Sequence, residues 1–171
     1  AQHGAGTKVL DAACGSCVNY EVLRNHKVPC VYTGLDRTDK LLEEAKRRYG
    51  DEITLVKGFV QEMPVPDESQ DVVILRHIVE HLEEGYELAI KEALRVAKKE
   101  VILVFFLTPR QEMTDIIEQS QPDENGCTYF WNTYSWPKFA QFVASLGVQI
   151  QVKHIQTPGA AHADTIVRLI K

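Results

Sequence analysis

Two aspartates, Asp11 and Asp36, stand where their side chains could hold a ligand. Each ends a short apolar run, and the small residues Ala12, Ala13, Cys14 and Gly15 follow the first one. Small residues let the backbone of a turn approach a ligand closely and leave amide groups free at the start of the next helix. A carboxylate beside such a turn disfavours a phosphate and suits a ligand with an amino group or a sulfonium. Asp36 comes 25 residues after Asp11, where an acid is placed to bond both ribose hydroxyls of a nucleoside.

Cys14 and Cys17 form a Cys-x-x-Cys at the predicted strand-to-helix turn. A thioredoxin-like redox site shares this spacing, and a helix N-terminus lowers the pKa of a thiol. The alternative is that two small residues simply fill a tight loop. Thioredoxin-like chains do not carry paired acids at the places of Asp11 and Asp36, so we favour the second interpretation.

His77 to His81 spell His-x-x-Glu-His, the signature of inverted zinc proteases. Zinc hydrolysis needs a third protein ligand and an open position, and carboxylates are scarce in the expected downstream region. The motif also follows a buried strand. We therefore expect no metal site. His77 and His81 fit the rim of a pocket, where either could act as a general base, although His81 could equally be structural or bonded to water.

Five short apolar runs alternate with amphipathic stretches, which favours a mostly parallel sheet covered by helices on both faces. The runs are residues 7–11, 31–36, 53–57, 71–75 and 101–107. Two closing strands are expected at residues 148–155 and 165–170, and residues 111–134 are the least regular segment, expected on the acceptor side.

The predicted helices have clear boundary signals. Thr38 can cap a helix over residues 39–49, and Ser135 can cap one that Gly147 ends. A long helix is expected over residues 83–99, where two terminal lysines favour its C-terminal end.

The chain has 171 residues, which is the size of one α/β domain. Its net charge of -5 argues against a body that wraps nucleic acid. The longest apolar run is too short to cross a bilayer, and the first residues lack an apolar signal region. With four cysteines and no signal region, we expect a reduced, cytoplasmic setting and no membrane association.

The order of these motifs resembles the class I S-adenosylmethionine-dependent methyltransferases of the small Rossmann-like type. That family carries acid-x-Gly-x-Gly-x-Gly after its first strand, where this chain has Asp11 and Gly15, with Ala13 and Cys17 in place of the outer glycines. Residues 34–38, 41–45, 57–73 and 74–82 follow the family pattern in the same order. The resemblance covers residues 7–107 well. It implies one domain over residues 1–171, with a seven-stranded sheet, an antiparallel last strand and an N-terminal cap that is short or absent.

The resemblance implies that the first turn holds the methionine end of S-adenosylmethionine. Asp11 would lie near its amino group, while the backbone at Ala13, Cys14 and Gly15 would approach the ligand. Arg76 would face the methionyl end. The product would be S-adenosylhomocysteine.

The adenosine end would lie on the next two loops. Asp36 would hold the ribose with Arg37 beside the adenosine, and Gly58, Phe59 and Val60 would flank the adenine. Many family members have an acid where this chain has Phe59, so here the backbone or the ring would make that contact.

The methyl acceptor has no readable code in the sequence. The acidic balance favours a small molecule or a protein over RNA. A partner subunit or a second copy could cover the site where the N-terminal cap is short. Two other functions stay open: a non-catalytic nucleoside-binding regulatory module, which the replacements at Ala13, Cys17 and Phe59 favour, and a nicotinamide enzyme, which the glycine spacing disfavours.

Overall fold

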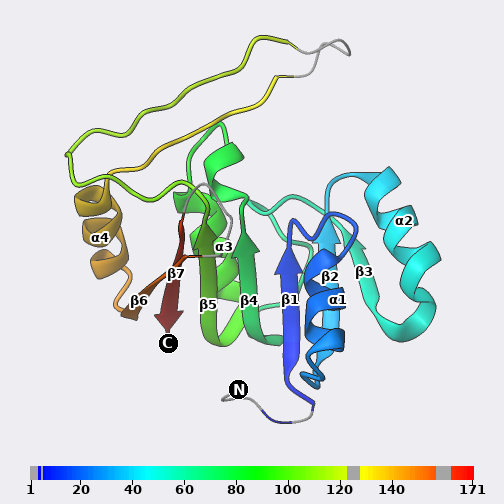
Figure 1. Cartoon of the computed structure of the whole chain (residues 1–171). Coiled ribbons are helices and arrows are strands. Elements are labelled where there is room, and N and C mark those ends of the chain that lie inside the picture. Colours follow the sequence, from blue (N-terminus) through cyan, green and yellow to red (C-terminus); the bar gives the residue numbers. More distant parts are fainter. Residues whose placement is uncertain (1–3, 5, 123–127, 157–162) are drawn as a thin grey trace.

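The computed structural model describes residue 4 and residues 6–122, 128–156 and 163–171. Its centre is a seven-stranded sheet of order β3-β2-β1-β4-β5-β7-β6 (Figure 1). The strands are β1 (Lys8–Ala12), β2 (Val31–Asp36), β3 (Thr54–Lys57), β4 (Gln70–Arg76), β5 (Ala97–Phe105), β6 (Gln149–Gln156) and β7 (Ala163–Ile170). β1 to β5 pair in parallel, and β7 is antiparallel to both of its neighbours. The predicted mostly parallel sheet with an antiparallel last strand is therefore confirmed.

Helices cover both faces of this sheet, because successive side chains of a buried strand point to opposite sides. Val9 of β1 packs in a cluster with residues of α1 (Val18–Asn25) and α2 (Asp39–Tyr49). Its neighbour Leu10 packs in a second cluster with residues of α3 (Glu87–Val96) and α4 (Trp136–Ser145). Two short 3-10 turns, η1 (Gly50–Glu52) and η2 (Val79–His81), complete the regular elements.

The strand order reverses between β1 and β4, and this places the site. From β1 the chain runs outward to β3, and it then returns to β4 on the other side of β1. In such sheets ligands bind in the crevice outside the carboxyl ends of the strands at the reversal. The loops that follow β1, β2 and β4 therefore meet at one edge of the sheet (Figure 1).

The predicted helix over residues 83–99 is wrong at both ends. Residues 79–81 form a 3-10 turn, and Gly85 has a positive φ of 79°, so the helix begins only at Glu87. Lys98 and Lys99 belong to β5, where Ala97 already pairs with β4. Lys99 Nζ also lies 2.8 Å from Asp71 Oδ1. Strand pairing and this ion pair therefore place the two lysines in β5, although lysines are also favourable at the C-terminal end of a helix.

The two predicted caps differ in how they act. α4 begins directly after Ser135, whose hydroxyl accepts a hydrogen bond from the Lys138 amide at 3.3 Å. α2 begins directly after Thr38, but the Thr38 hydroxyl makes no capping bond. The Thr38 amide instead donates to Asp36, which connects this helix start to the site.

Residues 106–122 and 128–135 run as extended chain that crosses the carboxyl edge of the sheet (Figure 1). Isolated bridges pair Ile116 with Thr133 and Gln119 with Phe130. Asn132 and Tyr134 anchor the segment, because Asn132 Nδ2 donates to the Leu82 carbonyl at 2.6 Å and the Tyr134 hydroxyl donates to the Val79 carbonyl at 2.7 Å. The irregular segment is thus fixed to the chain that follows β4. Among the described residues, no helix is long and apolar enough to cross a membrane.

Candidate active site

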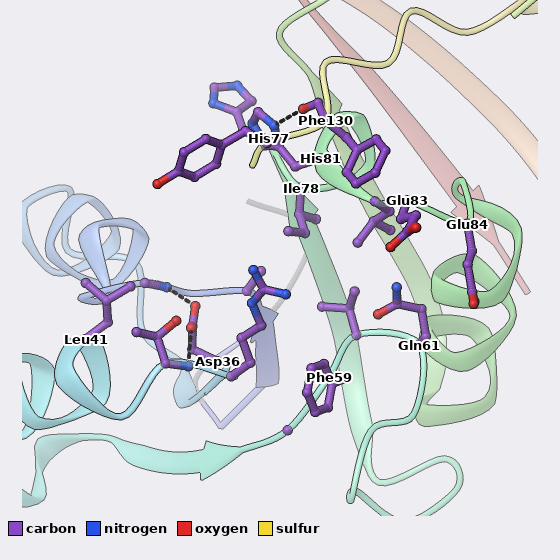
Figure 2. Close-up of a pocket in the computed structure, with 18 of the residues that line it drawn as sticks. Asp36, Leu41, Phe59, Gln61, His77, Ile78, His81, Glu83, Glu84 and Phe130 are labelled. Atoms are coloured by element: carbon purple, nitrogen blue, oxygen red, sulfur yellow. Dashed lines mark hydrogen bonds between the residues drawn. The ribbon is translucent and has the colours of Figure 1, made fainter. Parts of the chain in front are cut away.

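A cavity of about 710 Å³ opens at the carboxyl edge of the sheet. Its walls come from the end of β2, from the turns after β1 and β2, from residues 58–62, from residues 77, 78 and 81–84 and from residues 128–130. Figure 2 shows Asp36 and Phe59 on one side and His77, His81 and Phe130 on the opposite side. The cavity therefore has two halves, one for each group of residues that the sequence singled out.

Asp36 connects the first two turns through its carboxylate. Gly15 donates its amide hydrogen to Asp36 Oδ2 at 2.8 Å, and Thr38 donates its amide hydrogen to Oδ1 at 2.9 Å (Figure 2). Each oxygen of a carboxylate offers two lone pairs, so each still has one for a ligand. The chain thus fixes the acid at the cavity wall and leaves it able to accept two hydroxyl hydrogens.

Asp11 lies behind the wall and is buried. The Asn19 amide nitrogen donates to its two oxygens at 3.1 and 3.0 Å, and the Tyr32 hydroxyl donates to Oδ2. Burial raises the pKa of the Asp11 carboxyl, while the hydrogen bonds from Tyr32 and Asn19 act in the opposite direction. Asp11 therefore connects β1 to α1 and β2 and does not line the cavity.

The first turn has an unusual backbone. Ala13, Gly15 and Cys17 all have positive φ, at 66°, 54° and 63°. Positive φ costs energy for residues other than glycine and is found where the surroundings fix it, often at functional sites. Here the amides of Ala13 and Cys14 both donate to the Leu35 carbonyl at the end of β2, at 2.8 and 2.9 Å. The turn is thus held against the neighbouring strand, with Ala13 and Gly15 at the cavity wall.

Gly58 and Phe59 form the wall beyond β3. A Cβ atom on residue 58 would lie 2.5 Å from Pro64 Cδ, so the backbone there has no room for a side chain. Phe59 lines the cavity with 59% of its surface exposed. A flat apolar group could stack on this ring.

The opposite wall carries the two histidines. His81 Nδ1 lies 2.7 Å from the Phe130 carbonyl oxygen, which accepts its hydrogen and leaves Nε2 as the basic nitrogen. The ring stacks on Phe106 at 5.4 Å and meets Trp131 edge-on at 5.1 Å. His77 has a positive φ of 53°, and its Nε2 lies 3.5 Å from Asp164 Oδ1. Both rings therefore have fixed orientations at the cavity.

Glu80 lies between the histidines in sequence but faces the interior. Its Oε1 accepts hydrogen bonds from the amides of Phe106 and Leu107 at 2.8 and 3.4 Å, and its main-chain carbonyl accepts one from Asn132. Its Oε2 is buried without a hydrogen-bond partner in the part of the chain that the structure describes. Burial raises the pKa of Glu80 to about 7.

Glu80 should therefore make stability depend on pH. Since its pKa is higher in the folded than in the unfolded chain, the free energy of unfolding should fall as pH rises from about 4.5 to about 7. At 1.36 kcal/mol per pKa unit, the loss is roughly 3 kcal/mol. Glu80→Gln should remove this slope, because glutamine keeps the acceptor oxygen and cannot ionise. Urea unfolding at several pH values measures the effect, and the exposed Glu118→Gln serves as control. If the free energy of unfolding changes with pH in the same way in the wild type and in Glu80→Gln, Glu80 does not cause this pH dependence.

The structure places most of the predicted site residues at the cavity wall. They are Ala13, Gly15, Asp36, Arg37, Gly58, Phe59, Val60, His77 and His81. Asp11, Cys14 and Arg76 do not line it. Cys14 and Asp11 are buried, and exposed Arg76 donates from Nη1 to Asn19 Oδ1 at 3.3 Å, which connects it to the Asp11 group.

Several wall residues have no signal in the sequence. Glu62, Glu83 and Glu84 are ordinary surface acids in the sequence, and only the fold turns them toward the cavity. Tyr129 and Phe130 belong to an aromatic-rich stretch, which does suggest contact with an acceptor. The members of the zinc-like motif have separate partners, and among the described residues no group of three or more His, Cys, Asp or Glu could hold a metal ion.

Comparison with known proteins shows which family the chain belongs to. A family model described as a methyltransferase domain matches residues 10–105, which is more than half of the chain. The chain therefore belongs to the methyltransferase domain family. The resemblance to class I S-adenosylmethionine-dependent methyltransferases is confirmed, and S-adenosylmethionine is the methyl donor of that class, as predicted.

Solved structures share the fold at low sequence identity. An S-adenosylmethionine-dependent methyltransferase from Methanosarcina mazei has a TM-score of 0.73 and 15% identity, covering 99% of this chain and 94% of that one. The 1,6-didemethyltoxoflavin-N1-methyltransferase of Burkholderia thailandensis has a TM-score of 0.73 and 13% identity, covering 98% and 72%. The magnesium protoporphyrin IX methyltransferase of Synechocystis, solved with S-adenosylhomocysteine, has a TM-score of 0.68 and 16% identity, covering 98% and 75%. At these identities the likeness establishes the fold.

Proposed function

We propose that this protein transfers a methyl group from S-adenosylmethionine to an acceptor in the same cavity. The observation that carries the proposal is Asp36, an acid at the end of β2 that is held by two amides and faces a cavity at the strand-order reversal. The cavity volume is within the usual range for small-ligand sites. A bound S-adenosylmethionine supplies an electrophilic methyl group on a sulfonium, so the chain mainly has to align the two reactants.

The residues of the first two turns fit such a donor. Asp36 has a free lone pair on each oxygen for the two ribose hydroxyls, and exposed Phe59 offers a flat apolar face for adenine. Ala13 and Gly15 present backbone at the wall for the methionine end, with the Asp11 carboxyl buried behind them.

The opposite half of the cavity fits the acceptor. His81, with Nδ1 committed to Phe130, keeps Nε2 available to take a proton from an acceptor that must lose one. Glu62, Glu83 and Glu84 also line the cavity, and Arg37 is the one lysine or arginine among the described wall residues. This charge disfavours a polyanion. A small molecule or a protein side chain is therefore the proposed acceptor class, and RNA is not.

Calorimetric titration with S-adenosylhomocysteine tests the donor site. We expect one site per chain and micromolar or tighter binding, unchanged by a millimolar excess of nicotinamide-adenine dinucleotide. The same titration checks the nicotinamide alternative, because competition by the dinucleotide would favour it. Absence of S-adenosylhomocysteine binding by a folded chain would overturn the proposal.

A second measurement separates an enzyme from a non-catalytic binding module. The protein is incubated with S-adenosylmethionine labelled on its methyl group, together with pooled small metabolites or with proteins. The label should move to an acceptor, and S-adenosylhomocysteine should accumulate. If the acceptor must be deprotonated, transfer by His81→Ala should be slower by a factor of about 100. Binding without transfer to any fraction would favour the binding module.

A further inference from the structure

We propose that Cys14 and Cys17 form a reversible disulfide in the turn after β1, with hydrogen peroxide as the oxidant, and that this disulfide and the donor exclude each other. The exclusion rests on the proposed function, since it requires the donor to lie on this turn. The disulfide itself rests only on the geometry of the two cysteines. It is distinct from a thioredoxin-like activity, because it acts on the protein's own site.

The backbone places the two cysteines at disulfide distance. The Cys17 amide donates to the Cys14 carbonyl at 2.9 Å, which closes a four-residue turn. In such a turn the first and fourth Cα atoms lie within about 7 Å. Disulfides bridge Cα atoms that are about 4.4 to 6.8 Å apart. The turn therefore meets the first requirement without a change in its ends.

The side chains also point to one place. A Cβ atom on Gly34 of β2 would lie 2.8 Å from Cys14 Sγ and 2.9 Å from Cys17 Sγ. Because both distances start from the same point, their sum is an upper limit, and the two sulfurs lie within 5.7 Å of each other. Both thiols are free and buried, and both lie over Gly34, which has no side chain. Gly34 thus makes the room in which the sulfurs meet, and the loop-filling role expected from sequence is compatible with this pairing.

The electrostatics distinguish the two thiols. The interaction between the two thiols lowers the pKa of Cys17 and raises the pKa of Cys14, while Tyr32 adds to the lowering at Cys17 and burial opposes it. The Cys14 thiol donates to the Gly15 carbonyl at 3.5 Å. Cys17 also stands at the N-terminus of α1, where a thiolate is favoured. Cys17 is therefore the nucleophile and Cys14 the resolving thiol.

The chemistry balances in two steps. The Cys17 thiolate attacks one peroxide oxygen, an S–O bond forms, the O–O bond breaks, and hydroxide leaves and is protonated to water. Cys14 then loses its proton and attacks the Cys17 sulfur, an S–S bond forms, the S–O bond breaks, and a second water leaves. Two thiols lose two electrons, and one peroxide becomes two waters.

A disulfide between the cysteines would affect the cavity through Gly15, which lies between them in the sequence. Gly15 lines the cavity and donates its amide to Asp36. A disulfide holds its sulfurs about 2.05 Å apart, so both cysteine side chains must leave their present positions and the cross-link constrains the turn that carries Gly15. A donor on this turn would favour the arrangement of the reduced form. By linkage, the disulfide would weaken donor binding by the same factor by which the donor disfavours the disulfide at equilibrium.

Mass spectrometry tests the disulfide on the intact wild-type chain. After treatment with hydrogen peroxide and blocking of remaining thiols, trypsin should release one peptide, residues 9–24, that holds both cysteines. We expect this peptide to be about 2 Da lighter than its reduced form and to regain the mass with dithiothreitol. The loss of about 2 Da should be absent in Cys17→Ser and should be the same as in the wild type in Cys30→Ser. An unbridged peptide in the wild type would overturn the proposal.

Calorimetry then tests the exclusion. S-adenosylhomocysteine should bind the oxidised chain at least tenfold more weakly than the reduced chain, and saturating S-adenosylhomocysteine should slow disulfide formation at least tenfold. Equal affinity of both forms would overturn the exclusion. If reduced chain binds no S-adenosylhomocysteine at all, the proposed function fails, while the peptide mass still decides whether the disulfide forms.

Discussion

Asp36→Ala is expected to weaken S-adenosylhomocysteine binding by at least about 100-fold. The change removes the acceptors for both ribose hydroxyls, and hydrogen bonds to a charged group contribute roughly 1.5–3 kcal/mol each. A factor of 100 corresponds to about 2.7 kcal/mol. The same change frees the amides of Gly15 and Thr38, so the two turns lose their common anchor. Calorimetric titration of both proteins measures the difference.

Two variants make this result specific. Asp39→Ala removes an acid three residues away that pairs with Lys57 at 2.6 Å and does not line the cavity, so binding should stay within about twofold of the wild type. Asp36→Asn keeps one acceptor oxygen, so its affinity for S-adenosylhomocysteine should lie between those of the wild type and Asp36→Ala. If Asp36→Ala binds as tightly as Asp39→Ala, the ribose does not lie on Asp36.

Phe139→Ala is expected to lower the free energy of unfolding by about 3–5 kcal/mol, the usual cost of removing a buried phenylalanine. Phe139 of α4 is fully buried and meets Phe105, Tyr86 and Trp136 with ring centroids 5.5, 5.2 and 5.5 Å away. It therefore joins α4 to β5 and to the residue that precedes α3. Because domains are stable by only about 5–15 kcal/mol, this is a large part of the total. Urea unfolding followed by circular dichroism measures it.

Phe142 gives a matched control on the same helix. Its ring is half-buried and lies 5.5 Å from that of Tyr86, so Phe142→Ala should cost clearly less than Phe139→Ala. Equal losses for both variants would show that the α4 contact is not the anchor that the structure indicates. Phe139 also lies beyond the residues that the family model matches, so this result tests whether the C-terminal part belongs to the same cooperative unit.

The sheet was predictable because its strands are buried on both faces. A parallel strand covered by helices is apolar at nearly every position, and β1, β2 and β4 carry that pattern in the sequence. Boundaries were less predictable. Lys98 and Lys99 suit the end of a helix, but strand pairing at Ala97 and the ion pair to Asp71 place them in β5.

The site was predictable where one loop carries the chemistry. Asp11 lies near the end of β1, Gly15 lies in the turn that follows, and Asp36 ends β2, so their order in the chain already places them at one edge of a parallel sheet. Glu83 and Phe130 were not predictable in this way. They reach the cavity because Asn132 and Tyr134 hold the extended segment against the chain after β4, and contacts across about 50 residues leave no local pattern.

By itself, the sequence determined the fold class, the family and the pair of acids on the first two strands, because these depend on local runs of apolar and small residues. The tertiary structure decided the rest. It placed Asp11 behind the wall and Asp36 at it, because only the packing of Tyr32 and Asn19 buries the first acid. It brought both cysteine sulfurs over Gly34, and it put His81 against Phe130 across the cavity from Asp36. These are distances between separate elements, and they are fixed only when the sheet and its helices pack together.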